Sequence, residues 1–278
     1  MTQIGRSTAR HSLSIPGRPG QSVALSWAAA TDIGRKRALN EDSFLAEAPF
    51  FVVADGMGGH ASGDVASAAV VQRLAQEGSS DFVEPEQIMT ALRIATADIT
   101  LAADDDDLGV GTTATGAVLT LADGVPCFAV FNIGDSRVYQ FADGVLTQVT
   151  VDHSVVQELV DAGLLAQDQA EFHPDANIIT RAVGFNAEPM ADLWMLPVRT
   201  GLRLLICSDG LTREVSDVAL RQMLGAGLGP QGTATALVDA ALTAGGRDNI
   251  TLVIVDVVES PDTAPLENTI PRRDAATA

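Results

Sequence analysis

Aromatic residues, cysteine and histidine are scarce in this sequence. Aromatic side chains make up 4% of the 278 residues, so a hydrophobic core has to be built mainly from Ala, Val, Leu and Ile, and apolar residues make up 46% of the chain. Two cysteines cannot form a disulfide framework, which fits a reducing cytoplasm. The four histidines are scattered and neither cysteine has a partner at ligand spacing, which argues against a zinc site.

Long apolar runs and positive charge are also lacking. No stretch reaches the roughly 18 uninterrupted apolar residues of a membrane span, and the N-terminal residues contain no apolar segment typical of a secretion signal. The 17 basic and 36 acidic residues give a net charge of −19, which repels nucleic acid and anionic membranes. We therefore expect a cytoplasmic protein with neither of these as a partner. The many carboxylates suit hard divalent cations, although solubility alone would also explain them.

The composition divides the chain into a body and two terminal segments. Residues 1–22 are rich in Ser, Gly, Pro and Arg and contain no acid, which predicts a disordered basic arm. Residues 259–278 predict a disordered polar tail. No Pro/Gly-rich linker or internal repeat interrupts residues 23–258, so we expect a single domain there.

The body contains both strand and helix patterns. Helical periods follow Ser62 as a candidate N-cap and Pro85 as a first-turn proline. Asp123-Gly124 and Asp143-Gly144 lie where hairpin turns would fall. Strands and helices do not alternate regularly, which favours an α+β fold, a four-layer α-β-β-α sandwich with two antiparallel sheets flanked by helices. The predicted strands are 23–30, 50–54, 113–121, 126–133, 137–141, 192–198, 202–207 and 250–258, and the predicted helices are 64–77, 85–99, 153–165, 216–224 and 233–244.

The segment LLICSDGLTR (204–213) fits two different phosphatase chemistries. Cys207 and Arg213 have the spacing of a thiolate nucleophile and its phosphate-binding arginine. The same segment is an apolar run that ends in Asp209-Gly210, which can present a carboxylate to a metal ion.

Three other aspartates share the second design. Asp55 and Asp135 follow apolar strands, and Asp248 directly precedes one. A single Asp-Gly is most often a turn, but four such carboxylates in one domain are harder to explain that way. If they converge, their repulsion requires cations, and oxygen ligands select Mg²⁺ or Mn²⁺. Two such ions bridged by a water molecule would lower its pKa and hold it for attack on phosphorus.

A phosphate group would also need a cation from the protein. Arg37 lies just before the acidic residues of RALNED and could bind phosphate oxygens. Beside Arg35 and Lys36, it is by itself more typical of a solvated loop.

With these motifs in order, the sequence resembles the metal-dependent protein phosphatases, the type 2C Ser/Thr phosphatases, in their bacterial single-domain form. The resemblance covers about residues 27–258. The motifs are RALNED (37–42), VADGMGGHASGDVAS (53–67), GTTAT (111–115), NIGDSRVY (132–139), ITRAVG (179–184), LLICSDGLTREVSD (204–217) and GGRDNITLVIVDV (245–257).

The resemblance implies a centre of two Mn²⁺ or Mg²⁺ ions and a weaker third site. Asp55 would bridge both ions, with the backbone carbonyl of Gly56 as a further ligand. Asp209 and Asp248 would hold the first ion. Glu41, with Asp42 as a second candidate, would act on the second ion through water. Asp135 would bind the third ion, and Arg37 would bind the substrate phosphate.

The implied reaction is hydrolysis of phosphoserine and phosphothreonine proteins by a metal-bridged hydroxide, without a phosphoenzyme. Such an enzyme opposes bacterial Ser/Thr kinases. Many eukaryotic relatives have a histidine as general acid where this chain has Met57, so His60 becomes a candidate acid, with a metal-bound water as the alternative. A monomer is the default expectation because no apolar helix seam is visible.

Several alternatives remain. Asp209 would put a carboxylate into the phosphate loop of a cysteine phosphatase, and Cys207 ends an apolar strand, so the Cys–Arg spacing is interpreted as coincidence. A catalytically silent phosphatase-like binding module would have lost one of these aspartates or Arg37, and all are present. A third alternative is a phosphatase that acts on anti-sigma-factor antagonists. Such phosphatases usually carry a sensory domain, which we do not expect in this chain.

Three other segments remain as weaker predictions. Asp104–Asp107 lacks the ligand spacing of a calcium loop. Residues 163–189 correspond, by resemblance, to a flap that sets substrate choice, and Thr269 is a candidate phosphoacceptor.

Overall fold

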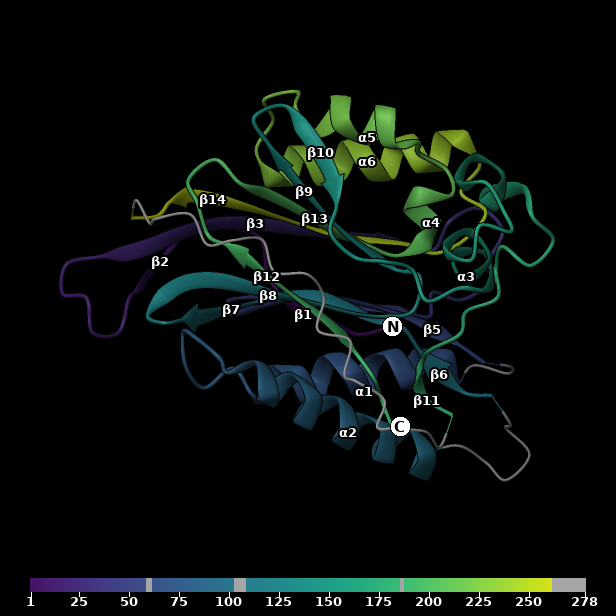
Figure 1. Ribbon diagram of the computed structural model, residues 1–278, viewed down its shortest axis with the longest axis horizontal. Coiled ribbons are helices and arrows are strands. Elements are labelled where there is room, and N and C mark those ends of the chain that lie inside the picture. The colour runs from purple at the N-terminus through teal and green to yellow at the C-terminus, as the bar shows by residue number, and fades with distance from the viewer. Residues whose placement is uncertain (59–61, 103–108, 186–187, 262–278) are drawn as a thin grey trace.

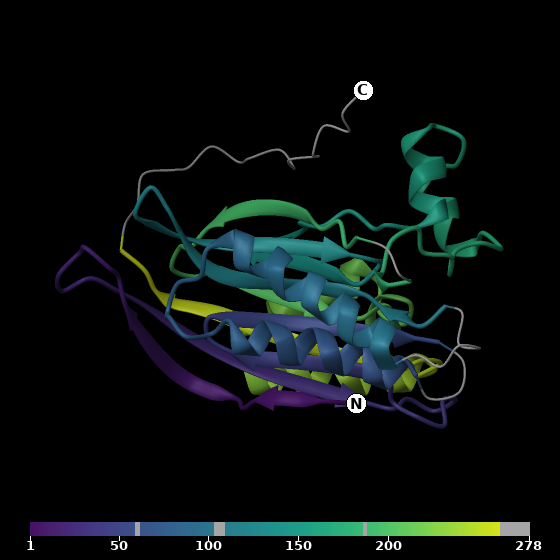
Figure 2. The same ribbon diagram turned by 90° about the horizontal axis from the view of Figure 1, so that it is seen from below.

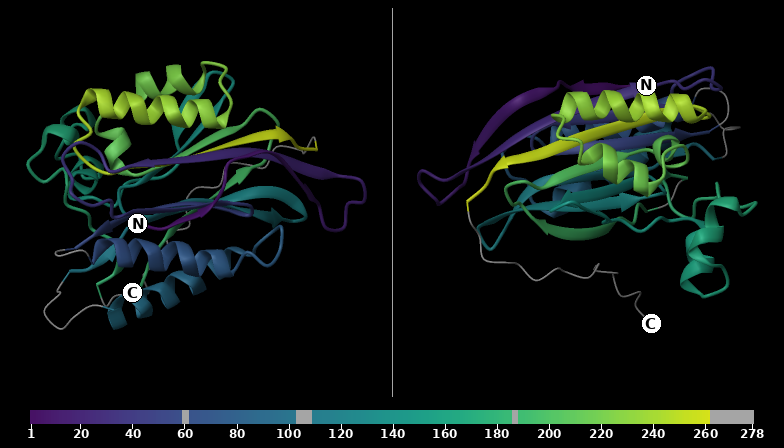
Figure 3. Two further views of the ribbon diagram at one scale, coloured as in Figure 1. Left: turned by 180° about the vertical axis from the view of Figure 1, so that it is seen from behind. Right: turned by 90° about the horizontal axis from the view of Figure 1, so that it is seen from above.

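The computed structural model describes residues 1–58, 62–102, 109–185 and 188–261 as a layered structure. Two β-sheets lie face to face in its centre (Figure 1). Helices α1 (Gly63–Gln76) and α2 (Pro85–Ala102) cover the outer face of one sheet, and α5 (Asp217–Leu224) and α6 (Pro230–Ala244) cover the outer face of the other (Figures 1 and 3). The predicted α-β-β-α sandwich is confirmed.

The two sheets are built largely from antiparallel pairs. The pairing of β1 with β4 is parallel, and every other pair of strands in the described residues is antiparallel. The first sheet has the order β1 (Gln3–Gly5), β4 (Asp42–Glu47), β5 (Phe50–Met57), β7 (Ala114–Ala122), β8 (Val125–Ile133) and β12 (Asp192–Pro197), with β6 (Gly111–Thr112) and β11 (Val183–Gly184) attached at one end of β5. The second sheet has the order β10 (Val145–Gln148), β9 (Arg137–Ala142), β13 (Arg203–Cys207), β14 (Ile250–Glu259), β3 (Ser22–Asp32) and β2 (Thr8–Ser14).

Burial on both faces explains why the central strands are continuous apolar runs. In β5, Val53 packs between the sheets while Val52 packs with α1 and α2. In β13, Leu204 faces the other sheet while Leu205 packs with α5 and α6. Because successive side chains point to opposite faces, a strand covered on both sides needs apolar residues at every position.

The two predicted hairpin turns are present. Asp123 and Gly124 join β7 to β8, and Asp143 and Gly144 join β9 to β10. All four residues have positive φ angles, which Asp and Gly adopt more readily than other residues and which match the twist of the flanking strands.

The prediction of a disordered arm at residues 1–22 is wrong. Strand β2 extends the second sheet beside β3, and β1 extends the first sheet beside β4, so this segment joins the edges of both sheets. Leu13 and Ile15 lie in the core between the sheets, and the indole nitrogen of Trp27 donates hydrogen bonds to the carbonyl oxygens of Arg6 (3.0 Å) and Ala46 (2.9 Å). The polar composition concealed these apolar anchors because they are isolated in the sequence.

Other differences from the prediction are local. The short strands β4, β6, β10 and β11 and the one-turn helix α4 (Asp209–Thr212) were not predicted. Apart from β4, these elements have four residues or fewer, and segments of this length carry little periodicity. The third helix, α3 (Val155–Asp161), is shorter than its predicted range of 153–165, and the α3 region lies to one side of the sandwich (Figure 2). Residues 262–278, most of the predicted tail, lie outside the described residues. Among the helices in the described part, none has the length and apolarity needed to cross a membrane.

Candidate active site

Four of the predicted carboxylates meet at one end of the two sheets. Asp55 lies near the end of β5, Asp135 lies in the turn between β8 and β9, Asp209 begins α4 directly after β13, and Asp248 precedes β14. Burial holds the pKa of Asp55 well above its usual value, and the charges of Asp42, Asp209, Asp135 and Asp248 raise it further. The predicted convergence is therefore present, and it also includes Asp42.

Two carboxylate oxygens of this cluster have no hydrogen-bond donor among the described residues. Oδ1 of Asp42 and Oδ1 of Asp209 are buried without a hydrogen-bond partner among the described residues. A buried acceptor without a donor is costly, and a hard divalent cation would satisfy these oxygens as a proton would. The donor set therefore fits Mg²⁺ or Mn²⁺.

Two arginines already neutralise part of the cluster. Nη2 of Arg37 lies 2.8 Å from Oδ2 of Asp248. Nη2 of Arg213 lies 2.6 Å from Oδ2 of Asp209 and 3.4 Å from Oδ2 of Asp135. Within the described residues no three acidic, His or Cys side chains form a finished set of metal ligands, and these ion pairs turn carboxylate oxygens toward the guanidinium groups instead.

Hydrogen bonds from the GTT motif hold Asp55 in place. The backbone nitrogen of Asp55 donates to Oγ1 of Thr113 (2.9 Å), and the backbone nitrogen of Thr113 donates to the carbonyl oxygen of Asp55 (2.9 Å). Oγ1 of Thr113 also lies 2.9 Å from Oγ of Ser136, next to Asp135. The residues of the first sheet that carry Asp55 and Asp135 are thereby fixed relative to each other.

Asn249 organises the loop that contains Arg37 and Glu41. Its side-chain amide donates to the carbonyl oxygens of Ile33 and Leu39, both at 2.9 Å, and its Oδ1 accepts from the backbone nitrogen of Glu41 at 2.9 Å. Sequence reasoning assigned no role to Asn249. The signal was its place beside Asp248 before an apolar strand, where a buried amide can cross-link two loops.

Comparisons with known proteins agree with this geometry. A family model described as protein phosphatase 2C matches residues 34–241. The chain belongs to this family. It is 40% identical over 247 residues to the serine/threonine protein phosphatase PstP of Mycobacterium tuberculosis, covering 86% of this chain and 46% of PstP, so it spans about half of that relative. It is 37% identical over 239 residues to the serine/threonine phosphatase stp of Listeria monocytogenes, covering 81% of this chain and 93% of stp.

Solved structures of PstP have the same fold. The crystal structure of the M. tuberculosis protein superimposes with a TM-score of 0.77 at 37% identity, over 85% of this chain and all of the other. A structure of the PstP catalytic domain in complex with two manganese ions has a TM-score of 0.72 at 36% identity, over 85% of this chain and 99% of that one. The predicted family and fold are confirmed.

The two acidic residues of the phosphatase 2C motif RALNED differ in their surroundings. Asp42 is fully buried, burial raises its pKa to about 7, and Oγ of Ser208 donates to its Oδ2 at 3.0 Å. Glu41 is only partly buried, and burial raises its pKa while Arg37 lowers it. Asp42 therefore lies inside the cluster and Glu41 lies at its edge.

Gly56 is required by close backbone contacts. A Cβ atom at this position would lie 2.1 Å from the carbonyl oxygen of Gly63 and 2.6 Å from that of Glu41. Both distances are impossible for a real side chain, so any other residue would force the start of α1 away from the Glu41 loop. A side chain at this position would therefore strike the backbone of these two neighbouring segments.

Other predicted features cannot be placed or lie to one side. His60, Asp104–Asp107 and Thr269 fall outside the described residues. The predicted flap segment contains the short helix η1 (Gln167–Phe172), and at its end Val183 pairs with Thr112, which in turn pairs with Gly56. The flap segment is thus attached directly beside the carboxylate cluster.

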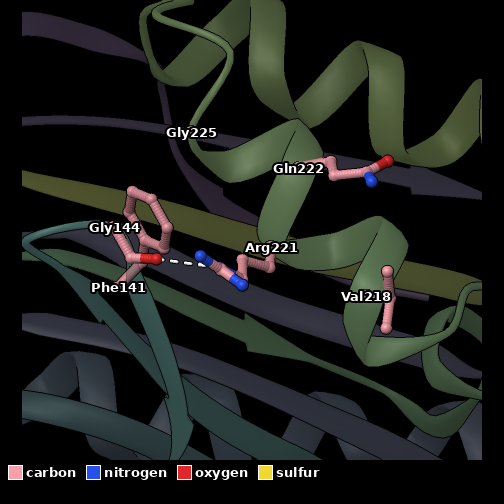
Figure 4. A pocket seen from close by; sticks show the side chains of 6 residues that line it. All are labelled: Phe141, Gly144, Val218, Arg221, Gln222 and Gly225. Carbon is pink, nitrogen blue, oxygen red and sulfur yellow. Dashed lines mark hydrogen bonds between the residues drawn. The ribbon is translucent and has the colours of Figure 1, made fainter.

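A cavity of about 440 Å³ lies apart from this cluster. It lies between α5 and the β9–β10 hairpin (Figure 4). There, Nε of Arg221 donates a hydrogen bond to the carbonyl oxygen of Gly144 at 2.8 Å. None of its six lining residues is a predicted site residue; they are Phe141, Gly144, Val218, Arg221, Gln222 and Gly225. The chemistry of the site is therefore not located in this cavity.

Cys207 is expected to be inert toward thiol reagents in the folded protein. Its side chain is fully buried, and burial raises the pKa of its thiol to about 12, so the reactive thiolate is absent at neutral pH. Mass spectrometry after incubation with iodoacetamide should find Cys207 unmodified until the protein is unfolded. Rapid alkylation of Cys207 in the folded protein would restore the thiolate interpretation.

Proposed function

We propose that this chain is a metal-dependent phosphoprotein phosphatase that hydrolyses phosphoserine and phosphothreonine esters. The observation that carries the proposal is the convergence of buried and partly buried carboxylates from both sheets, with donor-free oxygens, next to the half-exposed Arg37. The naming of the relatives PstP and stp as serine/threonine phosphatases supports the substrate class.

Two Mn²⁺ or Mg²⁺ ions are proposed as the cofactor, in agreement with the two manganese ions of the PstP catalytic domain. When bound, they would supply Lewis-acid activation of the phosphate and lower the pKa of the attacking water molecule. The residues proposed to hold them are Asp55, the carbonyl of Gly56, Asp209 and Asp248, with Glu41 acting through water. The family resemblance also implies a third ion at Asp135, but the ion pair between Asp135 and Arg213 argues against that ion in this chain.

The protein's own side chains would position the substrate. The side chain of Arg37 is 50% exposed, so its guanidinium can reach a phosphate group from solvent. Its hydrogen bond to Asp248 holds the planar donor group beside the carboxylates, where a phosphate dianion would otherwise be repelled. Arg37 therefore offsets the negative charge of the site for the substrate.

The protein partners, the cellular location and the general acid also belong to the proposal. We propose that phosphorylated Ser/Thr kinases and their substrates are the partners, in the cytoplasm of a bacterium. Met57 lies at the strand end next to Gly56 and cannot donate a proton to the leaving alkoxide. His60 or a water molecule stays the candidate acid, and a monomer stays the default.

The test is hydrolysis of a phosphothreonine peptide and of p-nitrophenyl phosphate by the purified protein. We expect activity with Mn²⁺, loss of activity with excess EDTA, recovery on adding Mn²⁺ back, and no effect of iodoacetamide. Activity that resists EDTA but is lost with Cys207→Ser would contradict the metal-dependent mechanism. A folded protein that binds Mn²⁺ without any hydrolysis would be a silent binding module.

A further inference from the structure

Arg213 is placed by α4 at the edge of the carboxylate cluster, beside Asp209 and Asp135. Helix α4 is a single turn that begins at Asp209, so Arg213 lies four residues further on the same side. Its backbone nitrogen donates to the carbonyl oxygen of Asp209 at 2.9 Å, and its side chain returns to Oδ2 of the same residue at 2.6 Å. The position of its guanidinium is thus fixed by the residue that it neutralises.

The same guanidinium nitrogen also serves Asp135. Nη2 of Arg213 lies 3.4 Å from Oδ2 of Asp135, whose side chain is 10% exposed. Among the ion pairs of the described residues, Arg213 is the cation that contacts both Asp135 and Asp209, while Arg37 contacts Asp248. A divalent cation shared by Asp135 and Asp209 would have to displace this nitrogen.

The ion pair with Arg213 uses only one of the two carboxylate oxygens of Asp209. Oδ2 of Asp209 faces Arg213, whereas Oδ1 has no hydrogen-bond partner in the described structure. Arg213 therefore occupies the side of Asp209 that faces Asp135 and leaves the other oxygen for an ion. This arrangement separates the oxygens available to a metal from those already neutralised by the protein.

The charges of the cluster agree with this division. Asp152 is paired with Arg137 and Asp64 with the N-terminal amine, so these groups cancel. The remaining charges are six carboxyl groups (Glu41, Asp42, Asp55, Asp135, Asp209 and Asp248) and two guanidinium groups (Arg37 and Arg213). When all are ionised, the excess is four negative charges, which two divalent cations neutralise. A third divalent cation would leave the buried cluster with a net positive charge unless Arg213 moved away.

We propose that Arg213 is the permanent counter-cation of Asp135 and that it limits this protein to two divalent cations. The proposal rests on the proposed function, because it takes the carboxylate cluster to be a metal centre. It assigns a role to the arginine of the Cys–Arg spacing that is unrelated to thiolate chemistry. Arg213 is a positioning residue: it holds Asp135 and the Asp135-facing oxygen of Asp209.

The experiment is an equilibrium titration of the metal-free full chain with Mn²⁺, in which free Mn²⁺ is measured by its electron paramagnetic resonance signal. We expect two bound Mn²⁺ per wild-type chain and three per Arg213→Gln chain, because the freed carboxylates of Asp135 and Asp209 then need a cation. Arg93→Gln is the matched control. It removes an arginine on α2 that forms an ion pair with the exposed Glu188, outside the cluster, and the variant should bind two Mn²⁺.

Asp135→Asn is a second variant that does not depend on the folding of Arg213→Gln. Because Asp135 is neutralised by Arg213 and not by an ion, we expect Asp135→Asn to bind two Mn²⁺, as the wild type does. Three ions bound by the wild type, an ion lost in Asp135→Asn, or two ions in a folded Arg213→Gln would each overturn the proposal while leaving the metal centre intact. A wild type that binds no Mn²⁺ would overturn the proposed function itself.

Discussion

Asp209→Asn is expected to lower the Mn²⁺-dependent kcat for phosphate ester hydrolysis by about 10³-fold, the loss often produced by removing one charge-stabilising group from an active site. Asn retains the shape of Asp but has one carbonyl oxygen and no negative charge. Asp209 supplies an oxygen without a donor at the centre of the cluster, and its side chain is 12% exposed, so water cannot easily replace it. The loss should therefore affect Mn²⁺ binding as well as turnover.

The measurement is kcat for p-nitrophenyl phosphate at increasing Mn²⁺, together with Mn²⁺ stoichiometry and circular dichroism. Asp217→Asn is the matched control, because Asp217 is an exposed aspartate at the start of α5 that accepts a hydrogen bond from Tyr139 and lies outside the cluster. It should retain wild-type activity. If Asp209→Asn keeps a kcat within tenfold of the wild type, Asp209 is not a ligand of the reactive centre.

Mn²⁺ is expected to stabilise the protein more at pH 7 than at pH 5. Burial raises the pKa of both Asp42 and Asp135 to about 7, so the folded metal-free protein binds protons that the unfolded chain has released. For a carboxyl group with a raised folded-state pKa, the favourable contribution is complete below the unfolded pKa near 4. It is lost as the pH rises through the folded value. For each group alone, this contribution to the free energy of unfolding is on the order of 4 kcal/mol.

The expected size can be read from melting temperatures. A difference of 1 kcal/mol corresponds to about 2–4 °C for a domain of this size, so the effect should amount to roughly 10 °C or more. We propose to measure Tm in EDTA and in saturating Mn²⁺ at each half pH unit from 5 to 7.5. The difference between the two curves isolates the cluster. His153, whose pKa is lowered by its burial and which acts in the opposite direction, contributes equally to both.

Asp42→Asn tests the assignment of this effect. It removes one of the two carboxyl groups whose pKa is raised to about 7 and replaces it with a neutral side chain of the same shape beside Ser208. The metal-free variant should lose less stability between pH 5 and pH 7 than the wild type does. A metal-free wild type that becomes relatively more stable than the Mn²⁺-bound form as the pH rises would contradict the raised pKa values.

The sequence by itself determined the layers and the carboxylates. Strands buried on both faces must be apolar at every position, and this requirement makes β5, β13 and β14 visible as continuous runs. The same runs end where burial ends, so Asp55, Asp209 and Asp248 are recognisable as candidates at strand ends. Their expected repulsion and need for cations follow from charge alone.

Only the tertiary structure decided which groups meet across long distances in the chain. Leu13 and Ile15 lie in a polar segment and become core residues because β2 joins the edge of the second sheet. Asn249 gains its role from a loop more than two hundred residues earlier. The sequence placed Arg213 at the spacing of a cysteine phosphatase motif, whereas in the structure its side chain contacts Asp209 and Asp135. Periodicity and composition report local burial, whereas these contacts depend on how distant strands and loops are brought together.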